Sequence, residues 1–145
     1  MIASQGWKNG LLRHPILGMF WLVFASVLFV SGCGMFPSKD GIIEQVVENG
    51  NSLRSEIVTP AGKFSDYRVY READADVVVF EHKLKPGLQI DKAIARSDQS
   101  KADLIAQLNS PGSRSALESG IDFVYLYTDT NGNTICRHAI TSADF

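Results

Sequence analysis

Cysteine and histidine are among the residue types in this chain that could act as a nucleophile, a base or a metal ligand. Cys136 and His138 are two residues apart, so in a strand their side chains would share one face. A thiol beside an imidazole can form a nucleophile and its base, or two ligands of a metal ion. No third partner lies near them in the sequence. We therefore interpret Cys136 as a small, half-buried strand residue and predict no catalytic residue and no metal site.

His82 follows the strongly apolar segment 77–80 and shares the alternation of Val78, Phe80 and Leu84. A histidine at the end of an apolar strand face is usually packed and hydrogen-bonded rather than a ligand. Motifs for phosphate, redox or zinc chemistry are absent from the sequence, including a glycine-rich phosphate loop, Cys-x-x-Cys and H-E-x-x-H. We therefore expect no cofactor.

Cys33 has a different setting, because two small residues, Ser31 and Gly32, directly precede it and follow the apolar run 16–30. Lys8 and Arg13 lie before that run, and no acidic residue occurs before position 40. A positive start, an apolar stretch and small residues at the cleavage site are typical of a secretory signal peptide.

The pattern Val30-Ser31-Gly32-Cys33 resembles the lipobox of bacterial lipoproteins. The resemblance implies that a diacylglycerol is attached to the Cys33 thiol, that the chain is cut between Gly32 and Cys33, and that the new amino group also takes a fatty acid such as palmitate. Two or three acyl chains anchor a protein lastingly, whereas one binds reversibly. Gly34 rather than aspartate after the cysteine implies passage to the outer membrane, facing the periplasm, in enterobacteria-like sorting.

This interpretation divides the chain into a signal peptide (1–32), a lipidated N-terminus with a short tether (33–38) and one domain (39–145). The alternative is an uncleaved membrane helix, since nothing between Pro15 and Ser38 is charged and a span needs about 20 apolar residues. In either case the domain would be tied to a membrane.

Loss of Lys8 and Arg13 with the signal leaves 12 basic against 16 acidic residues, a formal charge of −4. Nucleic-acid binding requires clustered basic residues, so the composition argues against it. About 110 residues are enough for one small domain with a single core. Cys136 would be the one cysteine left without a lipid, so no internal disulfide is expected.

The periodicity predicts an α+β fold with about four strands in one mainly antiparallel sheet, helices on one face, and a terminal β-hairpin. A helix capped by Ser38 should end at Asn49-Gly50-Asn51, and 53–63 should be a loop or a short edge strand. The remaining expected elements are strands at 66–72 and 76–84, an interrupted helical segment at 91–108, a helical turn at 113–119, and strands at 121–128 and 134–141 around Asn131-Gly132.

Within the interrupted segment, Ser100 and Asp103 resemble a capping box, and Ala102, Ile105 and Leu108 should form the buried side, with Leu104 beside them. In the second strand, Val77 and Val79 oppose Val78 and Phe80. If helices cover only one face, this conflict predicts either a second covered face or an exposed apolar patch.

The segment from Gly120 to Gly132, with Tyr125 and Tyr127, is weakly similar to the C-terminal part of small uncharacterised envelope lipoproteins. We expect a non-enzymatic binding or assembly module with an envelope protein as partner, as in lipoproteins that escort or brace envelope machinery, including secretion pilotins. Tyr67, Tyr125 and Tyr127 would form a binding site if they converged on an exposed groove. The alternative is an envelope enzyme or inhibitor whose site is assembled from distant residues, and a pocket joining His82, His138 and Cys136 would favour it.

Overall fold

The computed structural model describes residues 38–73, 75–88, 91–108 and 111–145. The lipobox residues Gly32 and Cys33 lie outside the described residues. The elements follow one another as α2 (Lys39–Ser52), α3 (Arg54–Ile57), β1 (Phe64–Arg71), β2 (Val77–Leu84), α4 (Lys92–Ala95), α5 (Asp98–Gln107), α6 (Pro111–Glu118), β3 (Asp122–Thr128), β4 (Thr134–Ile140) and the 3₁₀ turn η1 (Ser142–Asp144).

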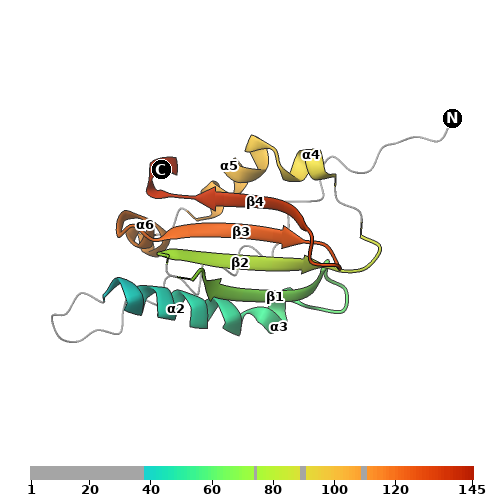
Figure 1. The fold of residues 1–145 in the computed structure, drawn as a ribbon, viewed down its shortest axis with the longest axis horizontal. Helices are drawn as coiled ribbons and strands as arrows, with labels where there is room; N and C mark the ends of the chain where they lie inside the picture. The colour runs from blue at the N-terminus through green and yellow to red at the C-terminus, as the bar shows by residue number, and fades with distance from the viewer. Residues whose placement is uncertain (1–37, 74, 89–90, 109–110) are drawn as a thin grey trace.

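The four strands form one sheet in the order β1-β2-β3-β4 (Figure 1). The pairs β1–β2 and β3–β4 are antiparallel, while the central pair β2–β3 is parallel. A parallel pair needs a crossover connection, and the segment carrying α4, α5 and α6 supplies it. The predicted α+β class and mainly antiparallel sheet are therefore confirmed.

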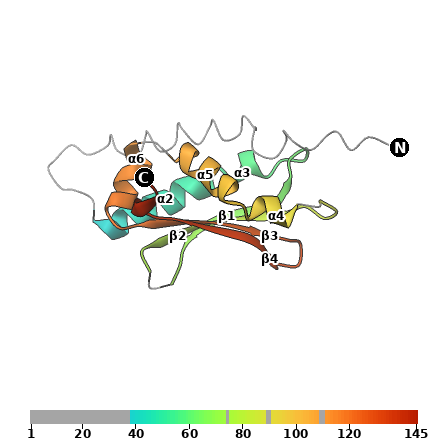
Figure 2. The same cartoon turned by 90° about the horizontal axis from the view of Figure 1, so that it is seen from above.

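The helices lie together on one side of the sheet, which Figure 2 shows from above. α2 begins as expected, because the Ser38 side chain accepts a hydrogen bond from the Gly41 amide at 3.2 Å. The prediction that Asn49-Gly50-Asn51 ends this helix is wrong, since α2 continues to Ser52. Gly50 is buried against β1, so it serves close packing and not chain reversal.

Two other local expectations are also wrong. Part of the segment 53–63 is helical: α3 is a single turn closed by bonds such as Val58 N–H to the Arg54 carbonyl at 2.8 Å. α5 is capped by Ser97 rather than by Ser100. Leu104 and the predicted Leu108 are buried and Ile105 is half-buried, but Ala102, which was expected to be buried, is exposed. In both places the packing of apolar side chains in the core, Ile57 in α3 and Leu104 in α5, outweighed a weak local sequence pattern.

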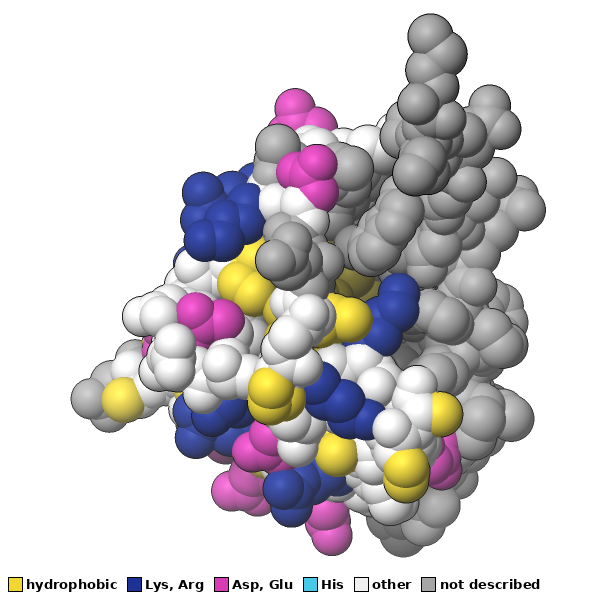
Figure 3. All heavy atoms as spheres, turned by 90° about the vertical axis from the view of Figure 1, so that its right-hand side faces the viewer, with side chains coloured by type: hydrophobic (Ala, Val, Ile, Leu, Met, Phe, Trp, Pro, Cys, Tyr) yellow, Lys and Arg dark blue, Asp and Glu magenta, His cyan; other side chains and the backbone are white. Residues whose placement is uncertain are grey.

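The β3–β4 hairpin has the predicted Asn-Gly turn, with Gly132 at a φ of 85°. The Asp129 carboxylate accepts the amides of Asn131 and Asn133, each at 2.8 Å. The loops that follow α3 and β2 lie at the same end of the sheet as this turn (Figure 1). Figure 3 views this end, where single hydrophobic side chains are scattered among lysines, arginines and acidic groups.

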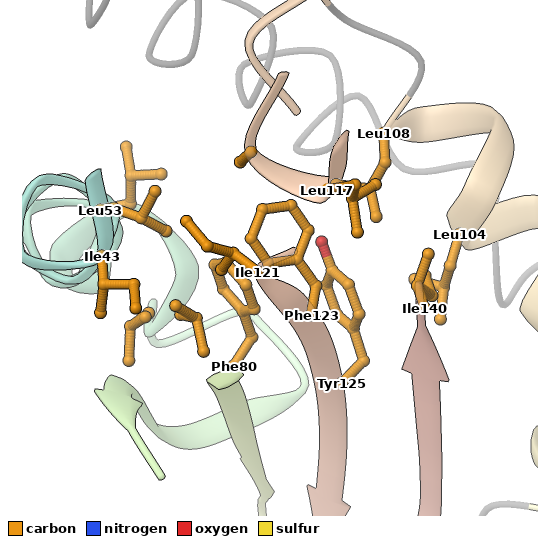
Figure 4. Packing of buried hydrophobic residues seen from close by; sticks show 14 of the residues in the cluster. Ile43, Leu53, Phe80, Leu104, Leu108, Leu117, Ile121, Phe123, Tyr125 and Ile140 are labelled. Carbon is orange, nitrogen blue, oxygen red and sulfur yellow. The ribbon is translucent and has the colours of Figure 1, made fainter. Parts of the chain in front are cut away.

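The main core lies between the sheet and the helices (Figure 4). Phe80 on β2 meets Phe123 edge-to-face with ring centroids 5.8 Å apart, and it stacks on Tyr125 at 5.0 Å. Ile43 of α2 and Leu117 of α6 close the core from the helical side and are each 1% exposed. Phe80 and Phe123 are each at most 1% exposed, so both rings belong to this core.

The opposite face of the sheet carries no described helix, which resolves the conflict between the valines of β2 (Figure 2). Val79 is only 3% exposed, although it points away from Phe80. Its cross-strand neighbours are Tyr70 on β1 and Val124 on β3, and Glu81 follows it on the same face. Val79 and Val124 are therefore buried on a face that no described helix covers (Figure 2), while Val77 and Leu126 on the same face stay half-buried.

Candidate functional site

The three tyrosines singled out in the sequence do converge, and they converge on His82. The register pairs His82 with Tyr67 on β1 and with Tyr127 on β3, and Tyr125 lies two residues before Tyr127 on the same face. The His82 ring is 4.9 Å from the Tyr67 ring and 4.9 Å from the Tyr127 ring, measured between centroids. Phe64 completes the group at 5.0 Å from His82. We call these five residues the aromatic cluster.

The aromatic cluster lies on the helix-covered side of the sheet, so it does not form an exposed groove. Tyr67 is 1% exposed, Tyr125 6% and His82 7%. Packing therefore accounts for the presence of these rings, and the expectation that His82 is packed is confirmed. A binding role for Tyr67, Tyr125 and Tyr127 stays a prediction.

Burial keeps every titratable member of the aromatic cluster uncharged. It lowers the pKa of His82 to about 4, because the protonated ring would lose its hydration. Burial likewise raises the pKa of Tyr67, Tyr125 and Tyr127. Within the described residues, His82 Nδ1 and the Tyr67 hydroxyl find no hydrogen-bond partner. An imidazole with so low a pKa is a weak general base at neutral pH.

Cys136 and His138 share a face of β4, as their spacing predicted, but each is engaged structurally. His138 Nε2 lies 2.7 Å from the Ala95 carbonyl oxygen, which links β4 to α4. Burial raises the pKa of the Cys136 thiol, and only a thiolate is strongly nucleophilic. The structure thus gives this cysteine the environment of a packed residue.

The structure also keeps His82 apart from Cys136, so the two do not share a site. His82 is paired with Tyr127, and Tyr127 with Cys136, so β3 lies between His82 and the thiol. Two strand spacings are about 10 Å, beyond direct hydrogen-bonding reach. Among the described residues, no group of three or more histidine, cysteine or acidic side chains is arranged to hold a metal ion.

We call the face of the sheet that carries no described helix the open face. It has a feature that the sequence did not predict, because that feature depends on strand register. Arg68 and Glu81 are cross-strand partners joined by an ion pair of 2.7 Å, and the Arg68 guanidinium lies 5.0 Å from the centre of the Tyr70 ring. Arg137 on β4 reaches Glu72 at 3.6 Å. Between these charged groups lie half-buried apolar side chains, among them Val77 and Leu126, with exposed Ala139 beside them.

A second unanticipated group fixes the start of α2, where the tether would join the domain. Lys39 and Arg71 both contact Asp76, at 2.8 and 3.1 Å, and Arg71 also contacts Asp40 at 2.7 Å. The hydrogen bond from Lys39 lowers the pKa of the Asp76 carboxyl. We call these four residues the ionic clamp, because they tie the first turn of α2 to the β1–β2 hairpin. As for the membrane, no helix within the described ranges combines the length and the hydropathy that a span needs.

Comparison with known proteins yields a likeness of fold. The chain is similar to the type II secretion system pilotin AspS from Vibrio cholerae, with 13% identity, a TM-score of 0.47, and coverage of 74% of this chain and 94% of that one. It is also similar to EpsS, a pilotin from the Vibrio vulnificus type 2 secretion system, with 11% identity, a TM-score of 0.46, and coverage of 73% and 93%. No family model and no curated protein sequence matches. Likeness at this level describes the path of the chain and assigns no activity.

Proposed function

We propose that this protein is a lipid-anchored lipoprotein of the bacterial envelope whose domain is a non-enzymatic binding or assembly module. The observation that carries the anchor is Val30-Ser31-Gly32-Cys33 at the end of an apolar run, six residues before the first described helix begins at Lys39. Acyl chains on Cys33 would hold the domain at the membrane surface. Gly34 after the cysteine supports the outer membrane, with the domain facing the periplasm.

The environments of the Cys136 thiol and the His82 imidazole support the proposed binding module. The Cys136 thiol has a raised pKa, His82 is held neutral in the aromatic cluster, and β3 separates the two. These groups stabilise the fold, and none is placed as the nucleophile and base that hydrolytic chemistry requires.

The surface we assign to a partner is the open face of the sheet. It presents the half-buried apolar side chains Val77 and Leu126, with Arg68, Tyr70 and Arg137 around them. Protein interfaces commonly have an apolar core and a polar rim, and they are enriched in tyrosine and arginine. The partner is proposed to be an envelope protein, since the mature charge of −4 does not suit a nucleic acid.

Metabolic labelling of cells with a radioactive fatty acid tests the anchor. The wild-type chain should take up label, whereas Cys33→Ser should take up none, because a hydroxyl does not replace the thiolate in the alkylation. Unchanged labelling of the variant would refute the lipoprotein assignment. Recovery of the protein in the inner membrane on a density gradient would contradict the outer-membrane assignment.

Crosslinking in cells tests the partner surface. The lipidated protein should retain one envelope protein in near-equal amount, and Ala139→Asp should abolish this retention by placing a charge on the open face. Ala61→Asp is the matched control, because Ala61 is also an exposed alanine but lies in the loop before β1. Equal retention of the partner by both variants would rule out the open face as the binding surface. Enzymatic turnover that is lost on mutating Cys136 or His138 would point to an enzyme instead.

A further inference from the structure

Three parts of the chain meet at the end of the domain where α2 begins. α2, the β1–β2 hairpin and the residues after α6 meet there (Figure 1). The ionic clamp joins the first two of these elements. The Lys39 ammonium lies 3.2 Å from the position that a Cβ would take on Gly120, just after α6. We call this region the tether end.

An exposed aromatic residue occurs at the tether end. Of the described residues, two large hydrophobic side chains are exposed, Phe145 at 44% and Leu88 at 37%. Phe145 lies under the Arg114 guanidinium of α6, 5.4 Å from its carbon to the ring centre. Arg114 lies in α6, and Gly120, which faces Lys39, follows the end of that helix by two residues, so Phe145 and the start of α2 lie at one end of the domain. Both views place η1 and the start of α2 at that same end.

Leu88 belongs to the opposite end. It follows β2, and its amide donates to the Lys85 carbonyl at 3.3 Å, while Lys85 is joined to Lys63 before β1. The β3–β4 turn lies at this end as well, which Figure 3 shows face-on. Strands of seven or eight residues separate the two ends by about 25 Å.

We infer that the tether end rests against the phospholipid bilayer and that the Arg114–Phe145 pair is a second contact of the domain with the lipid. This inference rests on the proposed acylation of Cys33. Residues 34–38 can then span at most about 20 Å, which keeps the start of α2 near the headgroups. A phenylalanine side chain can bury its ring at the boundary between headgroups and acyl chains, and a guanidinium beside it can bind a lipid phosphate.

The charges at the tether end indicate which groups supply the contact with the lipid. Lys39 and Arg71 are paired with Asp40 and Asp76, so the ionic clamp carries no net charge. The ionic clamp therefore adds no net attraction to anionic lipid, and the acyl chains, the Phe145 ring and the Arg114 guanidinium supply the contact. The geometry leaves the β3–β4 turn and the loop after β2 facing away from the bilayer.

The test uses the full lipidated chain in phosphatidylethanolamine–phosphatidylglycerol vesicles that contain a headgroup nitroxide. A fluorophore is attached at Ser119→Cys, at the tether end, or at Asn131→Cys, in the β3–β4 turn; both positions are exposed. Quenching should be several-fold stronger at position 119 than at 131. Phe145→Ser should weaken quenching at 119, whereas Leu88→Ser, which removes the other exposed hydrophobic side chain, should not.

Mass spectrometry of each sample separates failure of this inference from failure of the proposed function. A chain without acyl mass that does not float with vesicles refutes the anchor itself. An acylated chain with equal quenching at both positions, or stronger quenching at 131, overturns the orientation. Quenching unchanged by Phe145→Ser, in a variant whose circular dichroism melt matches wild type, removes the Phe145 contact.

Discussion

The side chain of Asn51 pairs with both backbone groups of Val69. Its Nδ2 donates to the Val69 carbonyl at 2.7 Å, and its Oδ1 accepts from the Val69 amide at 2.8 Å. One amide of α2 therefore takes the place that a neighbouring strand would occupy at the edge of β1. Exposed strand edges invite pairing with other chains, so this contact both stabilises α2 on the sheet and closes one edge of it.

Asn51→Ala should lower the free energy of unfolding by about 1–3 kcal/mol, because it leaves the backbone donor and acceptor of Val69 without partners. Asn49→Ala is the control in the same helix and should change stability by less than about 0.5 kcal/mol. Urea unfolding followed by circular dichroism measures both. Equal midpoints for the two variants would show that the paired amide contributes nothing.

Gly50→Ala should destabilise the domain by about 1–3 kcal/mol even though alanine is the better helix former. A Cβ at this position would lie 2.6 Å from Val69 Cγ2, which forces α2 and β1 apart. Gly41→Ala is the matched control in α2, with its nearest contact at 3.4 Å, and should be neutral or stabilising. Combining Gly50→Ala with Val69→Ala should give a smaller loss than the sum of the two single losses. Additive losses would exclude the steric explanation.

Phe80→Ala and Phe123→Ala should each cost about 3–5 kcal/mol, enough to unfold much of a marginally stable small domain. Both rings are at most 1% exposed and meet edge-to-face in the core. Phe145→Ala removes the same side chain from an exposed site and should leave the thermal midpoint nearly unchanged. A melt of either core variant that overlays the wild-type melt would contradict burial.

The stability of the domain should fall between about pH 6.5 and pH 4 because of His82. The unfolded chain binds a proton near the ordinary histidine pKa of 6.5, whereas the folded chain binds it only near a pKa of about 4. The unfolded state therefore gains protons first as the pH drops, and the loss approaches about 3 kcal/mol. His82→Phe keeps a ring in the aromatic cluster and should flatten the urea midpoint across this range. An equally steep fall in the variant would assign the pH dependence to other groups.

Local patterns in the sequence predicted the features that depend on near neighbours. Ser38 caps α2 because its own side chain reaches the Gly41 amide, and the Asn131-Gly132 turn forms because Gly132 accepts a positive φ. Alternation placed Phe80 and His82 on one apolar face of a strand, and that face is buried. The lipobox resemblance likewise rests on four consecutive residues and needs no fold.

Tertiary structure alone decided what depends on register and on close packing. Asn49-Gly50-Asn51 is by itself a helix-ending sequence. α2 continues through it because Val69 packs against the bare Gly50 backbone, and because the Val69 carbonyl accepts from Asn51 Nδ2 while its amide donates to Asn51 Oδ1. Periodicity could say that Tyr67, Tyr125 and Tyr127 lie on strand faces, but strand order decided that they meet around His82 beneath the helices. The same order separated His82 from Cys136 by one strand. Pairings between distant segments carry little local signal, because their energy comes from contacts that exist only once the chain is folded.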